Sequence, residues 1–558
     1  MRRLYCNGTI CTMANQTKDT EDGSSAVLTD DGRIIAVGDS KGLRESSPDA
    51  EIVDLEGGTM MPAFIDPHSH LSSYASSFLQ VPLEECTTFD EIAERVKSFI
   101  CQNAIEPGRW VIAKGYDHNL LTERKHPSLE LADSCAPNNP LILQHASGHV
   151  GVFNSLAMKE LGISPATVPP EGGTIGSDNG RLTGYMEENA YFTYIKKAPS
   201  AGWGELAESY KKAQDSYAAY GITSIQEGMF VKEMVPLYQQ LTKADMLYLN
   251  VTGYACVPDS DIVFRSFPGS VGKFDKNFRI GGYKIFLDGS PQGRTAWMRK
   301  PYEDNGTGQK DYCGYGTMKD DDVMAALMTA SDNGMQILAH CNGDAAAKQY
   351  LECIKRCDMR LSGREYCDDI NKSDAGECGC GSVNAAMARL RPVMIHAQLL
   401  AKDQLSDVRK LGVIPSFFVA HIYHWGDVHV KNFGMERASH ISPAGSALRE
   451  GIRFTFHQDT PVVEPDMLET IWCAVNRITR SGALLGADER ISVYEALKAV
   501  TVNAAYQYFD EDVKGSIEPG KNADFVILDK NPMKVSNEEI KDIKVMRTIK
   551  DDRVIFER

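Results

Sequence analysis

A His-x-His pair near the start of the chain is the feature that most directly suggests metal chemistry. His68 and His70 follow the apolar run MPAFID and are separated by one residue. On an extended strand, side chains two residues apart point to the same side, so both imidazole rings can bind one cation. Imidazole nitrogen suits Zn²⁺, and also Mn²⁺, Fe²⁺ or Ni²⁺, whereas a calcium site is built almost entirely of oxygen. The pair by itself is a weak signal, because two structural histidines would have the same spacing.

Further ionisable residues stand at the ends of other short apolar runs. Lys284 and Asp288 lie in RIGGYKIFLDG, His340 in GMQILAHCNG, His396 in RPVMIHAQ and Asp459 in RFTFHQDT. A single histidine of this kind is more often a core residue than a ligand, but four in equivalent positions are difficult to explain by packing. The sequence therefore predicts a divalent metal site, with Zn²⁺ as the first choice and one or two ions per chain.

The elements that must position these residues are repeated strand and helix units. Eight apolar runs ended by turn residues are expected to be strands: 61–66, 221–228, 247–255, 279–289, 334–343, 391–398, 412–418 and 453–460. Stretches with apolar residues at three- and four-residue steps are expected to be helices, including 204–220, 321–334, 344–357, 401–412 and 466–478. This α/β order predicts a (β/α)8 TIM barrel, in which reactive side chains come from the C-terminal ends of several strands.

The two ends of the chain share a different pattern. Residues 1–62 and 515–558 contain short alternating strands around tight turns, and we expect them to form one composite β-sandwich domain. Residues 63–514 would then be the catalytic TIM-barrel domain. That stretch is longer than a barrel needs, so we expect an insertion at about 72–205 that packs as extra helices and a small lid over the barrel mouth.

Composition and charge exclude several classes of function. The formal net charge of −17 and the absence of a basic cluster argue against nucleic acid or an anionic membrane as partner. No apolar stretch approaches the roughly 18 residues of a membrane span, and the N-terminus has no signal-peptide pattern, so we expect a cytoplasmic protein that acts on a small molecule.

The fourteen cysteines are scattered, which indicates reduced thiols and not a disulfide framework. Five of them are closer together: Cys353, Cys357, Cys367, Cys378 and Cys380. This group is either a small metal or redox site or, because its spacings lack the paired C-x-x-C form, a surface loop with free thiols.

Six sequence blocks together resemble a known family. MPAFIDPHSH, GGYKIFLDGSPQGRTAWM, AHCNGDAA, MIHAQ, HQDTPV and GSIEPGKNADFVILD are similar, in this order and over nearly the whole chain, to the YtcJ-like branch of the amidohydrolase superfamily. That branch, amidohydrolase family 3, includes N-substituted formamide deformylase. The resemblance is specific for the family and not for a substrate.

The resemblance implies a role for each ligand. His68 and His70 would bind the more buried metal, and His340 and His396 the second. Lys284 would bridge the two ions after reacting with CO₂ to form a carbamate, because an unmodified ammonium group is a poor metal ligand. The alternative for Lys284 is a salt bridge to Asp288, which would leave a site for one metal.

Asp459 would complete the metal site and transfer protons during catalysis. A carboxylate beside a metal-bound water can accept its proton as the hydroxide attacks, and can then pass the proton to the departing amine. The alternative for Asp459 is a helix N-cap before PVVEPDML, and one residue could serve both purposes.

Residues outside the metal site carry weaker signals. Those expected to bind substrate are His149, Arg294, Trp297 and His424; Asn154, Tyr423 and Trp425 are further pocket candidates. Each of them could equally be a packing or surface residue. Glu187 and Glu227 could orient the metal-binding histidines from behind, although the sequence assigns neither of them a partner.

The leading hypothesis is a metal-dependent amidohydrolase that cleaves a C–N amide bond in an N-acyl or N-formyl amine by attack of metal-bound hydroxide. A deaminase on the same barrel is less favoured, because it would want a glutamate after the fifth strand, where this chain has AHCNGD. A third hypothesis is a non-catalytic metal-binding regulatory protein, which a broken metal site would indicate. By family analogy we expect a homodimer.

Overall fold

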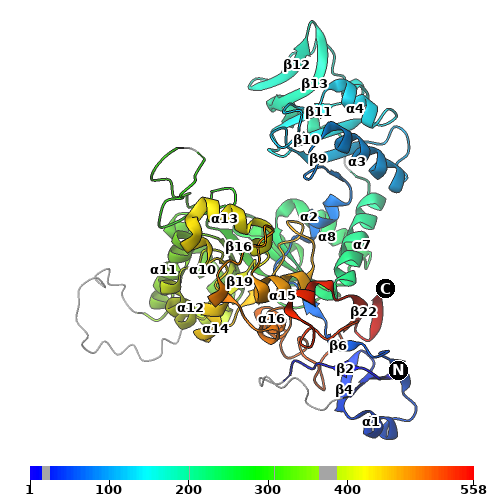
Figure 1. Cartoon of the computed structure of the whole chain (residues 1–558), viewed down its shortest axis with the longest axis vertical. Helices are drawn as coiled ribbons and strands as arrows, with labels where there is room; N and C mark the ends of the chain where they lie inside the picture. Colours follow the sequence, from blue (N-terminus) through cyan, green and yellow to red (C-terminus); the bar gives the residue numbers. More distant parts are fainter. Residues whose placement is uncertain (15–24, 200, 307, 364–385) are drawn as a thin grey trace, which may run out of the picture. The chain divides into compact units, whose positions relative to one another are not determined.

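The computed structural model describes residues 1–14, 25–199, 201–306, 308–363 and 386–558, and its central feature is a sheet of eight parallel strands (Figure 1). The strands pair in chain order: β7 (Phe64–Ile65), β14 (Ile222–Phe230), β15 (Asn250–Cys256), β16 (Phe278–Phe286), β17 (Gln336–Cys341), β18 (Val393–His396), β19 (Ile414–Phe417) and β20 (Thr455–Phe456). All eight lie within the runs predicted from the sequence or overlap them.

The two ends of this sheet are joined by the segments that follow β7 and β20. The Asp459 amide donates to the His68 carbonyl at 3.3 Å, and the His70 amide donates to the Thr460 carbonyl at 2.9 Å. The parallel sheet is therefore curled so that its first and last strands come together, which confirms the expectation of a TIM-barrel-like α/β fold.

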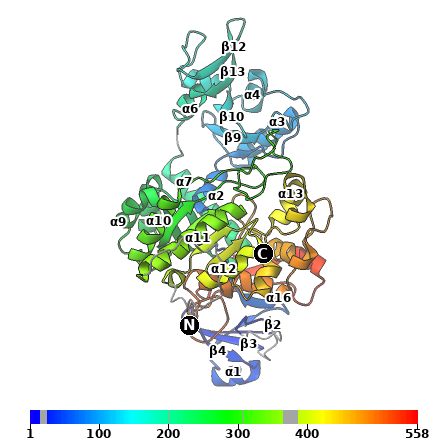
Figure 2. The same cartoon turned by 90° about the vertical axis from the view of Figure 1, so that its left-hand side faces the viewer.

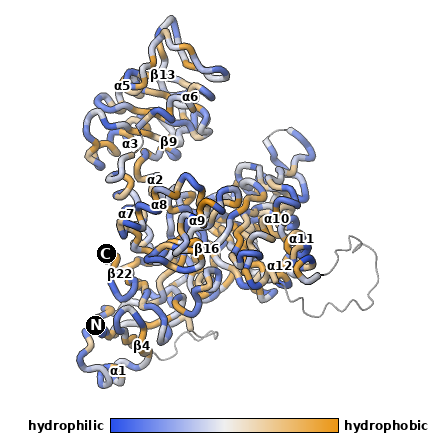
Figure 3. Tube along the Cα trace, turned by 180° about the vertical axis from the view of Figure 1, so that it is seen from behind, coloured by the Kyte–Doolittle hydropathy of each residue, from blue (hydrophilic) through white to orange (hydrophobic). Residues whose placement is uncertain are grey.

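Helices follow the strands and cover the outside of the sheet. They include α8 (Val235–Lys243), α9 (Ser260–Ser266), α10 (Asp320–Asp332), α11 (Asp344–Leu361), α12 (Leu405–Leu411), α13 (His421–Ala438) and α15 (Met467–Asn476). Figure 2 shows α10, α11 and α12 side by side. In α11, Ala346, Tyr350, Ile354 and Cys357 are buried at three- and four-residue steps, so one face of the helix packs inward. The alternating hydropathy colours along α10 and α11 in Figure 3 agree with this.

Strands from both ends of the chain build two further sheets. One has the order β4 (Arg33–Gly38), β3 (Ala26–Asp30), β1 (Arg2–Cys6) and β5 (Glu51–Asp54). The other has the order β2 (Thr9–Ile10), β6 (Thr59–Pro62), β21 (Phe525–Leu528), β22 (Val545–Lys550) and β23 (Arg553–Glu557). Tyr5, Val27, Phe525 and Ile549 belong to one buried hydrophobic cluster that draws on both sheets. A composite β-sandwich remains our interpretation of these sheets.

Residues Ser72–Ala213 form a compact unit of their own, separate from the unit made of Met1–Leu71 and Gln214–Arg558. Its sheet has the order β12 (Gly173–Asp178), β13 (Arg181–Glu188), β11 (Val150–Phe153), β10 (Leu141–His145), β9 (Val111–Tyr116) and β8 (Val81–Pro82). The unit also contains α3 (Phe89–Gln102), α4 (Leu129–Cys135), α5 (Ser155–Glu160) and α6 (Asn189–Ile195). The sequence predicted helices and a small lid here and not this sheet. Its strands β12 and β13 are only partly buried, so they lack the apolar runs that mark the barrel strands, whereas β10 and β11 are buried apolar runs that were not assigned as strands.

Two other expectations concern the described residues. None of their helices is both long and apolar enough to cross a bilayer. Cys353 and Cys357 are buried in α11, where their thiols face backbone carbonyl oxygens at 3.8 and 3.9 Å. Cys367, Cys378 and Cys380 lie outside the described residues.

Candidate metal centre

The six residues predicted as metal ligands all stand at C-terminal strand ends of the curled sheet. His68 and His70 follow β7, Lys284 lies in β16, His340 in β17, His396 ends β18, and Asp459 follows β20. One ligand atom each of His68, His396 and Asp459 lie within 4.8 Å of one another, which is the spacing that a bound ion requires. The structure therefore brings residues far apart in the sequence to one place.

The Asp459 carboxylate is the centre of this group. Its Oδ1 lies 3.5 Å from His68 Nε2 and 3.3 Å from His70 Nε2, and its Oδ2 lies 4.0 Å from His396 Nε2. Oδ1 is buried and has no hydrogen-bond partner among the described residues. A buried carboxylate oxygen without a partner is unfavourable, so this donor set fits a bound cation. Burial raises the pKa of Asp459, but the adjacent His70, His457 and Lys284 side chains outweigh it and hold the pKa below its ordinary value.

The alternative role of Asp459 as a helix cap is wrong. The N-cap of α15 is Asp466, whose side chain accepts from the Leu468 and Glu469 amides. Asp459 instead has a positive φ of 53°, outside the extended conformation that N-cap residues typically adopt.

His68 is oriented by Gln226, a residue that the sequence analysis did not single out. His68 Nδ1 lies 2.5 Å from Gln226 Oε1, and both side chains are buried. The Gln226 amide nitrogen donates to the Pro67 carbonyl at 2.8 Å, so the oxygen of that amide must face His68. His68 therefore carries its proton on Nδ1 and presents the Nε2 lone pair to the site. Burial lowers the pKa of His68 well below its ordinary value, so the ring is neutral.

His396 is oriented by a second buried histidine, His457, which the sequence analysis also missed. His396 Nδ1 lies 3.1 Å from His457 Nε2, and His457 Nδ1 lies 2.9 Å from Ser416 Oγ. If His457 donates to the serine, it accepts the Nδ1 proton of His396, which leaves His396 Nε2 free for a metal. The signal was present in the sequence, since His457 and Asp459 repeat the i, i+2 spacing of His68 and His70.

Lys284 is buried beside the site. Its Nζ lies 3.3 Å from His68 Nε2, and burial lowers the pKa of Lys284 to about 8. The alternative salt bridge is not what the structure shows, because the Asp288 carboxylate accepts from the backbone amides of Trp297, Asn342 and Gly343.

His340 stands at the edge of the group. Its ring centroid lies 4.7 Å from that of His396, and its Nδ1 lies 3.4 Å from Asp288 Oδ1. Its Nε2 lies 3.4 Å from Asn342 Nδ2, and its buried Nδ1 has no hydrogen-bond partner among the described residues.

The two residues that follow Gln226 also lie against histidines predicted as metal ligands. Glu227 is buried, and its Oε1 lies 4.0 Å from His70 Nδ1 while its Oε2 accepts from the Tyr238 hydroxyl at 2.8 Å. Glu227 therefore has the partner that the sequence could not assign. Gly228 packs directly against His68, since a Cβ at this position would lie 2.5 Å from His68 Cε1.

Three residues expected to bind substrate make hydrogen bonds to other residues of the chain. The Arg294 guanidinium donates to the Asp304 carbonyl and to Asn432 Oδ1. His424 lies 2.8 Å from Glu469 Oε1 and 3.0 Å from an Arg480 nitrogen. Trp297 is half-buried, and its backbone amide is bound to Asp288. Their roles toward a substrate remain predictions.

The other candidates outside the metal site are distributed differently. Tyr423 and Trp425 lie in α13, where the Trp425 ring packs on His421 with centroids 4.6 Å apart. His149, Asn154 and Glu187 lie in the unit of residues 72–213. His149 is exposed and lies 3.0 Å from Glu188 Oε2. Asn154 is the N-cap of α5, which explains its burial by a structural role.

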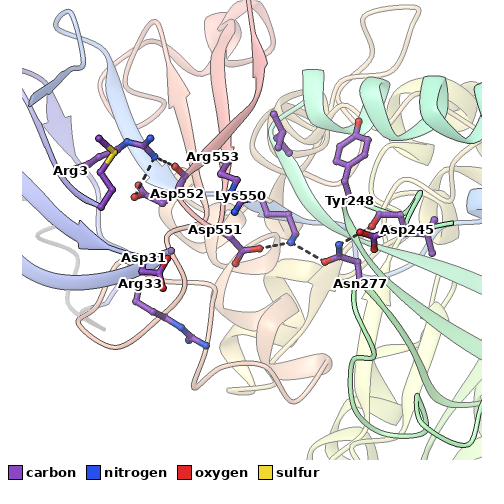
Figure 4. Close-up of a pocket in the computed structure, with 14 residues that line it drawn as sticks. Arg3, Asp31, Arg33, Asp245, Tyr248, Asn277, Lys550, Asp551, Asp552 and Arg553 are labelled. Atoms are coloured by element: carbon purple, nitrogen blue, oxygen red, sulfur yellow. Dashed lines mark hydrogen bonds and ion pairs between the residues drawn. The ribbon is translucent and has the colours of Figure 1, made fainter. Parts of the chain in front are cut away.

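A cavity of about 650 Å³ lies away from the strand ends that carry the histidines. Figure 4 shows that it is lined by charged residues of both signs, including Arg3, Lys550 and Asp551. Lys550 is paired with Asp551 at 2.7 Å, and Arg3 with Asp552 at 3.5 Å. These two pairs are therefore satisfied within the protein, and none of the six predicted metal ligands lines this cavity.

Comparisons with known proteins identify the family of this chain. The model of the amidohydrolase family matches residues 51–556. N-substituted formamide deformylase from Arthrobacter pascens is 28% identical over 96% of this chain and 95% of its own. The putative amidohydrolase YtcJ from Bacillus subtilis (strain 168) is 25% identical over 100% of both chains. A solved structure of an uncharacterized metal-dependent hydrolase from Pyrococcus furiosus has a TM-score of 0.72 and 25% identity, over 96% of this chain and 100% of that chain. The resemblance inferred from the sequence blocks is confirmed.

Proposed function

The chain belongs to the amidohydrolase family, and from this premise we propose that it hydrolyses a C–N amide bond in a small molecule of the N-acyl or N-formyl amine type. The general activity, metal-dependent hydrolysis, is supported by the family match and by the likeness to the Pyrococcus furiosus hydrolase. The choice of an amide is supported by the likeness to N-substituted formamide deformylase.

The observation that carries the proposal is the Asp459 carboxylate surrounded by three imidazoles. His68, His70 and His396 each present Nε2 to it, at 3.3 to 4.0 Å. Imidazole nitrogens and a carboxylate are the donors that Zn²⁺ and similar ions prefer, so these residues would hold the metal. When bound, a divalent cation supplies a Lewis acid for the scissile carbonyl and lowers the pKa of a water molecule toward neutrality.

Asp459 is the group placed to move protons during the reaction. As water attacks the carbonyl carbon, its proton passes to the Asp459 carboxylate, which is ionised because its pKa is held below the ordinary value. When the C–N bond breaks, the same proton goes to the departing nitrogen, which leaves as an amine. Gln226 and His457 take no part in these transfers; they hold His68 and His396 in the tautomer that leaves Nε2 free.

The test of the activity is a panel of N-formyl and N-acyl amines incubated with the metal-reconstituted full chain, with amine release as the readout. We expect release that depends on added metal and that is lost in Asp459→Asn. Release of ammonia from ring amines, with every amide left intact, would refute the proposal in favour of a deaminase.

We also propose that Lys284 is carboxylated and bridges two ions, one held by His68 and His70 and the other by His340 and His396. Its burial and its pKa of about 8 support this, because a substantial part of the amine is then neutral near physiological pH and can react with CO₂. The carbamate carbon would give a ¹³C NMR signal after growth of the protein with ¹³C-bicarbonate.

Metal content separates the bridged pair from a mononuclear site. We expect Lys284→Ala and His340→Ala each to contain less metal per chain than the wild type. A metal content that survives the loss of Lys284 would exclude the bridge and leave a mononuclear hydrolase.

A further inference from the structure

A second group of histidines lies in the unit of residues 72–213, outside the metal centre of the curled sheet. One ring nitrogen each of His118, His126 and His145 lie within 4.8 Å of one another. His145 ends β10, and His118 and His126 lie in the loop that follows β9. Because β9 and β10 are parallel, their C-terminal ends meet at the same edge of the sheet, and the loop returns to it.

An irregularity in the sheet places His145 in this group. The β9–β10 register shifts at Gln144/His145, so that Gln144 pairs with Lys114 while His145 pairs with Tyr116. The residue skipped on β9 is Gly115, whose φ of +102° suits glycine. The His145 and Tyr116 rings are consequently in contact, with centroids 5.2 Å apart.

The nitrogen atoms face one another at separations that a metal ion would span. His118 Nδ1 lies 3.0 Å from His145 Nε2, and the His118 and His126 rings stack with centroids 4.3 Å apart. Around a tetrahedral ion with metal–nitrogen distances near 2.0 Å, ligand atoms stand about 3.3 Å apart. Asp117 Oδ1, at 3.6 Å from His145 Nε2 and 3.8 Å from His118 Nδ1, is close enough to serve as a fourth ligand.

Neighbouring hydroxyl groups can hold two of the rings in the tautomer that metal binding needs. The Tyr116 hydroxyl lies 3.0 Å from His126 Nδ1, and Ser147 Oγ lies 2.9 Å from His145 Nδ1. Each hydroxyl oxygen can accept a proton from Nδ1 and leave Nε2 for the ion, which is the arrangement found behind metal-binding histidines. Ser147 also donates its amide to His145 Nδ1 at 3.0 Å, and that contact is given up when Nδ1 carries the proton.

The His126 and His145 rings are also neutral at physiological pH. Burial and the two neighbouring histidines lower the pKa of His126 to about 4, and burial likewise lowers the pKa of His145. A neutral imidazole needs no deprotonation before it binds a cation.

We propose that His118, His126 and His145 form a second metal site, which binds a divalent transition-metal ion of the Zn²⁺, Co²⁺, Ni²⁺ or Cu²⁺ class with Asp117 as a further ligand. Three imidazoles and one carboxylate select these ions over Mg²⁺ and Ca²⁺, which require more oxygen ligands. The ion ties the loop after β9 to the end of β10 and so stabilises the unit. This inference is independent of the activity proposed above.

The test uses the full chain with its first site disabled by His68→Ala/His70→Ala, titrated with Co²⁺. We expect this parent to bind Co²⁺ with the visible absorption of a tetrahedral nitrogen–oxygen site, and Zn²⁺ to raise its melting temperature. Adding His126→Ala and His145→Ala should abolish both effects. His149→Ala is the matched control, since it removes an exposed histidine of the same unit, and it should bind as the parent does.

A milder variant guards against loss of folding. His118→Ala changes a partly exposed loop residue, and we expect at least about tenfold weaker Co²⁺ binding with an unchanged circular dichroism spectrum. Parent-like binding in His118→Ala and in the His126/His145 variant would overturn the proposal. So would a parent that binds no Co²⁺ at micromolar concentration, which would leave the three rings as a hydrogen-bonded group without a metal.

Discussion

Replacing Gln226 by leucine tests whether the tautomer of His68 controls metal binding. The substitution keeps the approximate volume of the side chain but removes the oxygen that lies 2.5 Å from His68 Nδ1. The other partners of Gln226 are protected, because the Pro67 carbonyl still accepts from Gln507 at 2.9 Å and Tyr508 still donates to Asp66 at 2.8 Å. His68 is therefore the only one of these residues that loses its hydrogen-bond partner.

The expected magnitude follows from that single lost contact. A buried donor left without an acceptor costs about 1–3 kcal/mol, and His68 can avoid this cost by moving its proton to Nε2, the atom that binds the metal. Loss of such an orienting partner typically weakens metal binding by about 10–100-fold, which corresponds to about 1.4–2.8 kcal/mol. We expect Gln226→Leu to fall within this range.

The assay is equilibrium competition between the full chain and a chromogenic chelator, in the His126→Ala/His145→Ala background so that only the first site is titrated. Gln336→Leu is the matched control. Gln336 is also buried, and it donates to the Arg391 and Gln507 carbonyls at the opposite ends of the strands, away from every predicted ligand. We expect both variants to melt at a lower temperature but only Gln226→Leu to lose metal affinity. Affinity within about threefold of the parent in Gln226→Leu would refute the reasoning.

Three further predictions concern single residues. Asp459→Asn should lower kcat by at least about 100-fold on any amide substrate, because its neutral amide cannot accept the proton of the attacking water; retained turnover would exclude the proton-transfer role. Gly228→Ala should lower metal content without abolishing the fold, since the new Cβ would lie 2.5 Å from His68 Cε1 and displace the ring; wild-type metal content would contradict this packing argument. Burial raises the pKa of Asp466 from 3.8 to about 6, so the charged form is penalised in the folded state, and stability is lost as the pH rises from about 4 to about 6. Asp466→Asn, which keeps a capping side chain, should therefore be more stable than the wild type above pH 6, by about 3 kcal/mol at most, and this advantage should shrink toward pH 4. A difference in melting temperature between variant and wild type that is the same at pH 5 and at pH 7.5 would disprove it.

The order of the barrel strands and the positions of the ligands on them could be predicted from the sequence because both depend on local patterns. Short apolar runs mark strands that are buried on both faces, and the alternation of an extended chain puts His68 and His70 on one side. His457 and Asp459 have the same i, i+2 spacing. Strand positions and the side to which a side chain points depend on the local sequence and not on the residues across the sheet.

The strands and the histidine group of the unit of residues 72–213 could not be predicted in this way. The strands β12 and β13 pair with each other and are partly exposed, so their residues alternate weakly and resemble a loop. His118, His126 and His145 carry no regular spacing, and only the shifted register between β9 and β10 turns them into a group.

By itself the sequence determined the family and the strand order and predicted a set of metal ligands, since each follows from short stretches of chain. Only the tertiary structure decided which nitrogen of His68 and of His396 faces the site. The partner of His68 is 158 residues away and that of His396 is 61 residues away, and both meet their histidines through strand pairing and burial. A hydrogen bond across a barrel leaves no mark on the residues around either partner, because it is set by the distance between atoms and not by sequence spacing.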